Sequence, residues 1–187
     1  MAYGDDKDTA ASRLRHLTEF LHEHPITGPE GHSYIGSSPR ATRAFPGLPI
    51  NVRVLEHTDR TVAEVVEYTR GVNPDASPLP ENVQDVYRWC VENTVNAPEA
   101  EQQRREILEY KHQLEHAVAG GDIAVIRPHR CPECRTFGLM WDKLTQRIVC
   151  TNGECVAEDG TSTVVTFDRL AVAHVTNRKS LRRVSAT

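Results

Sequence analysis

Apolar residues recur at intervals of three and four along the first two thirds of the chain, which is the spacing of amphipathic helices. Leu14, Leu17 and Leu21 form one such stripe. Asn51 is a capping residue at the start of a second periodic segment, and Gly71 follows its end. The predicted helices cover about residues 9–24, 51–70, 81–95 and 98–119.

Two segments of this part lack the periodicity. Residues 25–49 contain five prolines and four glycines, a density of helix breakers that predicts a long surface loop. Residues 1–8 are polar and acidic, and we expect them to be disordered. The helical domain is therefore predicted to span residues 9–121.

The pattern changes after Gly121, where short β-branched and apolar runs replace the helical stripes. Ile123–Ile126 is predicted as a short strand, followed by three strands of a small sheet at 137–142, 146–149 and 162–167. Asp168 can cap a short helix to Val175, although a continuing strand fits the alternation of Leu170, Val172 and His174. Residues 176–187 form a basic tail. The fold class is thus α+β, with three to four N-terminal helices in a bundle and then a ribbon over 122–175.

Cysteines give the ribbon its chemistry. Two residues separate Cys131 from Cys134, fifteen more lie before Cys150, and four separate Cys150 from Cys155. Two close pairs a hairpin apart match a tetrahedral site with four thiolate ligands, so the sequence predicts one structural Zn²⁺. Disulfides and an iron–sulfur cluster are the alternatives. The fifth cysteine, Cys90, is interpreted as a small buried apolar residue.

Composition limits the function without identifying it. The 187 residues are 39% hydrophobic and 26% charged, with a formal net charge of −4, so any basic surface must be local. Because residues 1–8 are polar and acidic we expect no signal peptide, and the apolar runs are too short to span a membrane. Thiol ligands beside an odd cysteine favour the reducing cytoplasm.

Aromatic and basic residues on the ribbon suggest a nucleic-acid contact, because aromatic rings stack on bases and cations bind phosphates. The alternative is that the apolar face of the hairpin packs on the helices. The candidate residues of the ribbon are Arg135, Phe137, Trp141, Lys143 and Arg147, and those of the tail are Arg178, Lys179, Arg182 and Arg183.

His112, Glu115 and His116 spell the H-x-x-E-H motif of inverted zinc proteases. A metallohydrolase is the remote interpretation of this motif. The motif lies at the end of a predicted helix, where its side chains suit the polar, solvent-facing side opposite Leu114. We therefore expect no catalytic residues.

The order of elements resembles that of small helical-plus-zinc-ribbon proteins of actinobacterial phages and prophages. The similarity rests on Leu48-Pro49-Ile50-Asn51-Val52, Val86-Tyr87-Arg88-Trp89-Cys90, Arg127-Pro128 and Cys131-Pro132-Glu133-Cys134. Many members carry a helix-turn-helix segment after the ribbon and are taken to bind DNA. This chain has only about twenty residues after Phe167, too few for a two-helix reader, and Arg135 replaces the glycine usual after the first cysteine pair.

These observations predict a non-enzymatic accessory or regulatory protein that binds nucleic acid through its ribbon and tail, with the helices available for a homodimer or a partner. The alternative is an adaptor whose ribbon docks on a host or phage enzyme.

Overall fold

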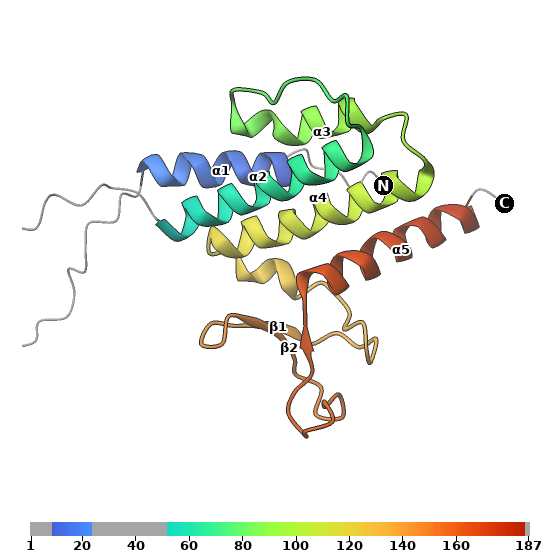
Figure 1. The fold of residues 1–187 in the computed structure, drawn as a ribbon. Coiled ribbons are helices and arrows are strands. Elements are labelled where there is room, and N and C mark those ends of the chain that lie inside the picture. The colour runs from blue at the N-terminus through green and yellow to red at the C-terminus, as the bar shows by residue number, and fades with distance from the viewer. Residues whose placement is uncertain (1–8, 24–51, 186–187) are drawn as a thin grey trace, which may run out of the picture.

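The computed structural model describes residues 9–23 and 52–185. Within them the chain forms five α-helices and a three-stranded antiparallel sheet, which confirms the α+β class (Figure 1). The α-helices are α1 (Ala10–Glu23), α2 (Val52–Val72), α3 (Val86–Thr94), α4 (Glu99–Ala119) and α5 (Phe167–Ser185). Two short 3₁₀ helices, η2 (Val83–Asp85) and η3 (Ile123–Ile126), complete the helical elements. The predicted disordered segment 1–8 and loop 25–49 lie outside the described residues.

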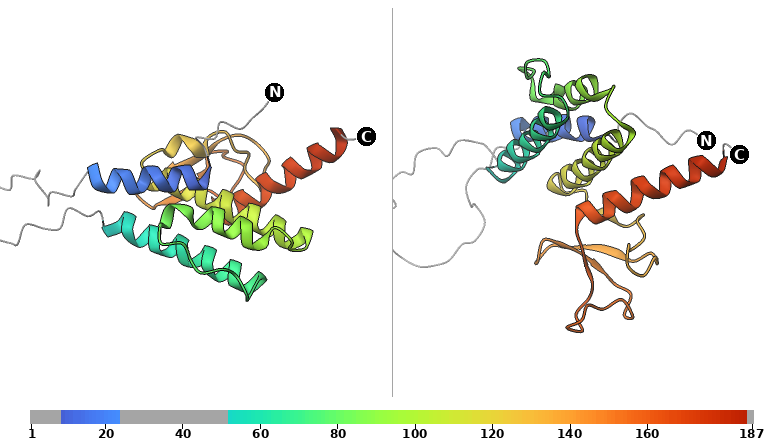
Figure 2. Two further views of the ribbon diagram at one scale, coloured as in Figure 1. Left: turned by 90° about the horizontal axis from the view of Figure 1, so that it is seen from above. Right: turned by 45° about the vertical axis from the view of Figure 1, so that its right-hand side comes forward.

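Helices α1 to α4 pack side by side above the sheet, and α5 crosses beneath α4 toward the C-terminus (Figures 1 and 2). Their core joins Leu14 of α1 and Val65 of α2 to a group of large residues on α3. That group is Val86, Tyr87, Trp89 and Cys90. Cys90 is buried, as predicted. None of the described helices combines the length and apolar character needed to cross a membrane.

The buried stripe of α2 differs from the predicted one at its start. Thr58, Val65 and Thr69 are buried as expected, but Leu55 is 40% exposed and Val54 takes its place. The inward face is rich in threonine, and the hydroxyls of Thr61 and Thr69 bond within the helix. Thr69 Oγ1 donates to the Val65 carbonyl at 2.7 Å, for example. A polar residue satisfied by its own helix can occupy a core position.

The sheet has the order β1-β2-β3, with β1 (Leu139–Asp142), β2 (Arg147–Cys150) and β3 (Val164–Val165). Leu139 pairs with Cys150, and Ile148 pairs with Val165. Alternation then directs Leu139, Ile148 and Val165 into the core, where each is at most 2% exposed. The second cysteine pair is thus anchored directly at the end of a paired strand.

The predicted strand at Ile123–Ile126 is wrong, because this segment is the 3₁₀ helix η3. Gly121 has a φ of 89° and reverses the chain after α4. The Arg127 amide then donates to the Ala124 carbonyl at 3.1 Å. This tight turn places Ile126 in the core.

The helix predicted from Asp168 to Val175 continues instead to Ser185, through the segment assigned to the tail. Leu170, Ala171 and Val175 are buried on its inner face. Arg178 and Lys179 then lie close to acidic residues of α4. Packing along α4 therefore favours a helix in this segment, where the local alternation of apolar residues also suits a strand.

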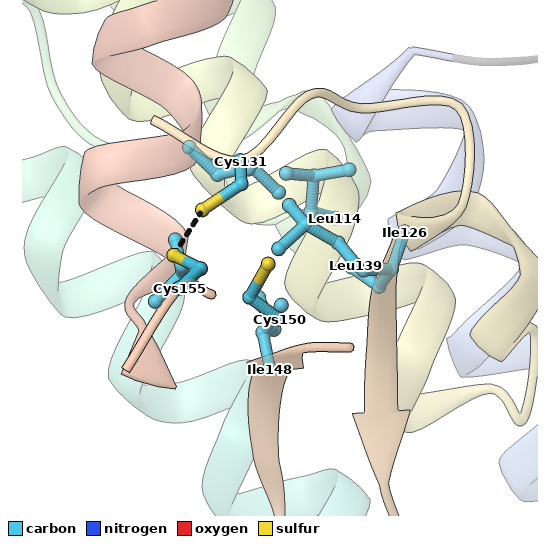
Figure 3. Packing of buried hydrophobic residues seen from close by; sticks show 9 residues of the cluster. Leu114, Ile126, Cys131, Leu139, Ile148, Cys150 and Cys155 are labelled. Carbon is cyan, nitrogen blue, oxygen red and sulfur yellow. Dashed lines mark hydrogen bonds between the residues drawn. The ribbon is translucent and has the colours of Figure 1, made fainter. Parts of the chain in front are cut away.

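One apolar cluster joins the sheet to the helices (Figure 3). Leu114 of α4 and Leu170 of α5 pack with Ile148, Val165 and the cysteines, and both leucines are at most 1% exposed. The predicted domain boundary between residues 121 and 122 therefore separates two segments that share one apolar core.

This sharing predicts a large effect of Leu114→Ala. The substitution should lower the free energy of unfolding by about 2–5 kcal/mol, because it opens a cavity between α4 and the sheet. Leu144→Ala is the matched control, since Leu144 is 94% exposed at the hairpin tip, and should change stability by less than about 0.5 kcal/mol. Denaturant unfolding measures both. Equal effects would show that the two halves do not share a core.

Candidate metal centre and basic ribbon edge

The four cysteines of the ribbon converge on one point. Cys131 Sγ lies 3.9 Å from Cys155 Sγ, and Cys134 Sγ lies 3.7 Å from Cys150 Sγ. All four sulfur atoms lie within 4.8 Å of one another. Among the described residues, this is the one group of three or more histidine, cysteine or acidic side chains whose ligand atoms converge in this way.

These separations fit a tetrahedral metal ion. Zn–S bonds of about 2.3 Å give sulfur–sulfur edges of about 3.8 Å, close to the two distances above. A disulfide requires about 2.05 Å, and all five cysteines are free thiols. The cluster is therefore arranged to bind a metal rather than to cross-link the chain.

The hydrogen bonds at the sulfurs also suit thiolate ligands. Backbone amides of Glu133 and Cys134 donate to Cys131, and the amide of Asn152 donates to Cys150. The Thr136 hydroxyl, 3.0 Å from Cys134 Sγ, lowers the pKa of that thiol to about 6. Burial raises the pKa of Cys150 to about 12 and also raises that of Cys131. A cation at the centre would favour four thiolates despite this burial.

A tight turn positions the first cysteine pair. The Arg135 amide donates to the Cys131 carbonyl at 2.8 Å, and the Cys131 amide donates to the Thr136 carbonyl at 2.9 Å. To close this turn Arg135 adopts a φ of 60°, in the left-handed region that favours glycine. The missing glycine noted in the sequence is thus a strained arginine in the structure.

Gly138 permits the two knuckles to approach. Its φ is 140°, and a Cβ atom at this position would lie 2.9 Å from Thr151 Oγ1. The Thr151 amide and hydroxyl donate to the Gly138 carbonyl at 2.9 and 2.8 Å. Any larger residue would push apart the segments that carry Cys134 and Cys150.

The two aromatic candidates of the ribbon have different environments. Phe137 is 59% exposed, and the Arg130 guanidinium lies 4.2 Å from its ring centroid. Trp141 is half-buried and packs on Phe167, with ring centroids 5.6 Å apart. Of these two rings, only that of Phe137 is therefore accessible for stacking. Trp141 fits the alternative interpretation, in which the apolar face of the hairpin packs on the helices.

The basic candidates also separate into groups. Arg135, Lys143 and Arg147 are exposed on the ribbon. Arg178 lies 3.9 Å from Glu106, and Lys179 lies 3.9 Å from Glu99, so both face acidic residues of α4. Arg182 and Arg183 fall in the last turns of α5, and their side chains lie outside the described residues. The structure does not bring the tail cations together with the ribbon ones as one described surface.

The solvent-facing interpretation of the H-x-x-E-H motif is wrong. His112 and His116 are at most 1% exposed, and Glu115 is partly buried. The histidines point into the space between α2, α3 and α4, where they contact Tyr87 and His57. The apolar periodicity of α4 gave no sign that the two histidines are buried, because they are polar residues that occupy core positions beside the leucine stripe.

Comparison of the chain with protein-family models, with curated proteins and with solved structures finds no match in any of the three. The resemblance to phage and prophage proteins therefore stays a prediction.

Sequence reasoning missed Arg130. Its guanidinium covers Phe137 and donates to the Arg135 carbonyl at 3.0 Å. Arg130 and Phe137 are paired across the knuckle as an isolated bridge. Only closure of the cysteine site brings these two residues together, so their spacing in the sequence carries no signal.

The strain at Arg135 makes a testable prediction. Arg135→Gly should stabilise the protein by about 0.5–1 kcal/mol, since glycine adopts a positive φ without steric cost. Arg135→Ala removes the same side chain but retains the strain, so it should bring no gain. Thermal melts of the metal-loaded protein compare the two. Equal melting temperatures would show that the backbone at this position is not strained.

Proposed function

We propose that the four cysteines hold one structural Zn²⁺ and that the ribbon around them binds nucleic acid, in a non-enzymatic accessory or regulatory protein of phage or prophage type. The observation that carries the binding proposal is the exposed Phe137 ring with the Arg130 guanidinium stacked on it. A thiolate-bound metal fits the predicted cytoplasmic location.

The zinc proposal rests on the donor set. Four thiolates fill the tetrahedral positions, which is the pattern of closed structural sites rather than of sites that activate water. When bound, the ion supplies folding free energy, about 10–16 kcal/mol of apparent binding in small zinc modules. The sheet needs such support because its strands are only two to four residues long.

Zinc removal tests this part. We expect one Zn²⁺ per chain, lost in Cys150→Ser, and we expect a chelator to abolish the sheet and α5, because Leu170 packs in the cysteine cluster. Helical circular dichroism should fall by the contribution of the 19 residues of α5. The core of α1, α2 and α3 contains no metal ligand and should persist. Elemental analysis without a metal would contradict the proposal, and an unchanged dichroism spectrum would contradict the link to α5.

The nucleic-acid proposal rests on the chemistry of one ribbon edge. Phe137 offers a flat apolar face, and Arg130 and Arg135 lie at the same knuckle as exposed cations. Lys143 and Arg147 lie at the other end of the hairpin, about 10 Å away along the strands. Bases can stack on the ring while the cations contact successive phosphates.

A titration of generic single-stranded and duplex DNA and RNA at two salt concentrations tests this edge. Phe137→Ala should lower affinity by about 1–3 kcal/mol without changing the salt dependence, because stacking is uncharged. Arg135→Ala combined with Arg147→Ala should flatten the log–log salt slope by about two units on duplex DNA. Arg178→Ala with Lys179→Ala should have a smaller effect, since these cations face Glu106 and Glu99.

Met140→Ala is the matched control. Met140 is 48% exposed on the face of β1 opposite the buried Leu139 and should not affect this binding. Absence of binding at low salt, or equal effects of Phe137→Ala and Met140→Ala, would contradict the proposal.

One observation favours the adaptor as the second candidate. Met140 pairs with Val149 and Val149 pairs with Val164, which forms an apolar row across the outer face of the sheet. Met140 and Val164 are 48% and 40% exposed. A protein partner that lost affinity on Met140→Ala, with no nucleic-acid binding, would support this function instead.

A further inference from the structure

A continuous line of hydrogen bonds crosses the space between α2, α3 and α4. Its members, in spatial order, are Arg60, His57, His116, Tyr87, His112, Glu64 and Lys111. We call this line the histidine relay. It contains the two motif histidines for which the proposed function has no role, and it does not depend on the metal or on nucleic acid.

The chemistry of the two ends fixes the direction of every bond. Arg60 can only donate, and its NH2 group lies 2.9 Å from His57 Nδ1, which must accept. His57 therefore carries its proton on Nε2 and donates to His116 Nδ1 at 2.8 Å.

The same reasoning continues to the other end. His116 donates from Nε2 to the Tyr87 hydroxyl at 2.8 Å, and that hydroxyl donates to His112 Nδ1 at 3.0 Å. His112 then donates from Nε2 to Glu64 Oε2 at 3.1 Å, and Lys111 donates to the same oxygen at 2.7 Å. His57 and His116 are thus neutral and of the Nε2–H form, and His112 also carries a proton on Nε2.

We propose that this relay is an acid-sensitive latch that holds α2 and α3 against α4 at neutral pH and releases them when His57 or His116 is protonated. Apart from the bond between Arg60 and His57, which lies within α2, each bond joins two helices. The bond from His57 to His116 connects α2 with α4, the two bonds of Tyr87 connect α3 with α4, and the bond from His112 to Glu64 returns to α2.

Protonation of His57 or His116 must break the relay because a charged imidazole has two N–H donors and no acceptor. A second proton on His116 Nδ1 would face the Nε2–H of His57, and one on His57 Nδ1 would face the Arg60 guanidinium. Reversal of the line cannot relieve this conflict, since Arg60 never accepts a hydrogen bond.

Protons can reach the relay without global unfolding. Glu64 and Lys111 line a groove of about 820 Å³ between α2 and α4. At the other end the Arg60 side chain is 58% exposed. Both ends of the line therefore meet solvent, while His112 and His116 are buried between them.

Burial favours the neutral histidines. It lowers the pKa of His57 and His112 to about 4 and that of His116 to about 2, Arg60 adds to the effect on all three, and Glu64 opposes it at His112 and His57. The charged groups that face the relay come from four helices: Arg13 of α1, Arg60 and Glu64 of α2, Glu109, Lys111 and Glu115 of α4, and Asp168 of α5.

The sign of the pH effect follows from these directions. Each relay histidine has a folded pKa below its unfolded value of 6.5, so the unfolded chain binds more protons between these values. The stabilisation is complete above about pH 6.5 and is lost as the pH falls. Burial raises the pKa of Glu109 to about 7 and raises that of Glu115, and these two groups oppose the trend.

The test compares variants at one position, so that contributions from Glu109, Glu115 and the metal site cancel. His57→Gln retains an amide donor toward His116 and an oxygen acceptor toward Arg60 but cannot be protonated. Between pH 6 and pH 4.5, the unfolding constant of the wild type should rise by about tenfold per pH unit more than that of His57→Gln. His16→Gln removes an exposed imidazole outside the relay and should behave as the wild type.

Two further readouts separate a latch from a merely buried cluster. Nitrogen-15 spectra at pH 7 should show His57, His112 and His116 in the Nε2–H form, and hydrogen exchange at pH 5 should be about tenfold faster for α2 amides in the wild type than in His57→Gln. Tyr87→Phe leaves one donor and one acceptor unpaired and should raise the unfolding constant about ten- to hundredfold at pH 7. Parallel pH profiles of wild type and His57→Gln, equal exchange in α2, or a doubly protonated relay imidazole at pH 7 would overturn the proposal.

Discussion

The convergence of four sulfur atoms against α4 is the constraint on which the lower half of the molecule depends. The sheet is too small to bury a core of its own, and its strands hold together because the cysteines, Leu139 and Ile148 share one cluster with Leu114. The cluster also receives Leu170, which fixes the start of α5. The cysteine cluster, the sheet and the start of α5 therefore form a single packing unit in this half.

The same convergence creates the chemistry of the ribbon edge. Closing the first knuckle forces Arg135 into a positive φ and brings Arg130 over Phe137. An exposed aromatic ring beside cations is thus a by-product of the geometry that the cysteines require. The helical half has a different organising element, a line of polar groups whose donors face acceptors on neighbouring helices.

Much of the fold could be predicted from local patterns, because the relevant signals are periodic or are tied to a motif. The four cysteine ligands, three strands and four N-terminal helices each follow from spacing alone. The conformation of Ile123–Ile126 could not be predicted, since the same apolar letters suit a strand or a tight turn and the choice depends on where Ile126 finds its core. The length of α5 depends in the same way on contacts with α4.

In the candidate site, too, some features could be predicted from local sequence and others depend on tertiary contacts. The spacing of its four cysteines is visible in the sequence, but exposure is a property of the folded surface. Phe137 and Trp141 look equivalent in the chain, and only the position of Phe167 separates them. His112 and His116 were expected in solvent because a polar residue in a core needs a partner, and their partners Tyr87 and His57 lie on other helices.

Helix α4 presents Leu114 to the sheet and His112 and His116 to α2 and α3, so it forms a wall common to both halves. Each residue of an α-helix turns the next by about 100°. Insertion or deletion of one residue in the middle of α4 would rotate both faces away from their partners together. The helix contains no glycine or proline at which such a change could be absorbed. Insertions and deletions among proteins related to this chain should therefore be confined to segments outside α4.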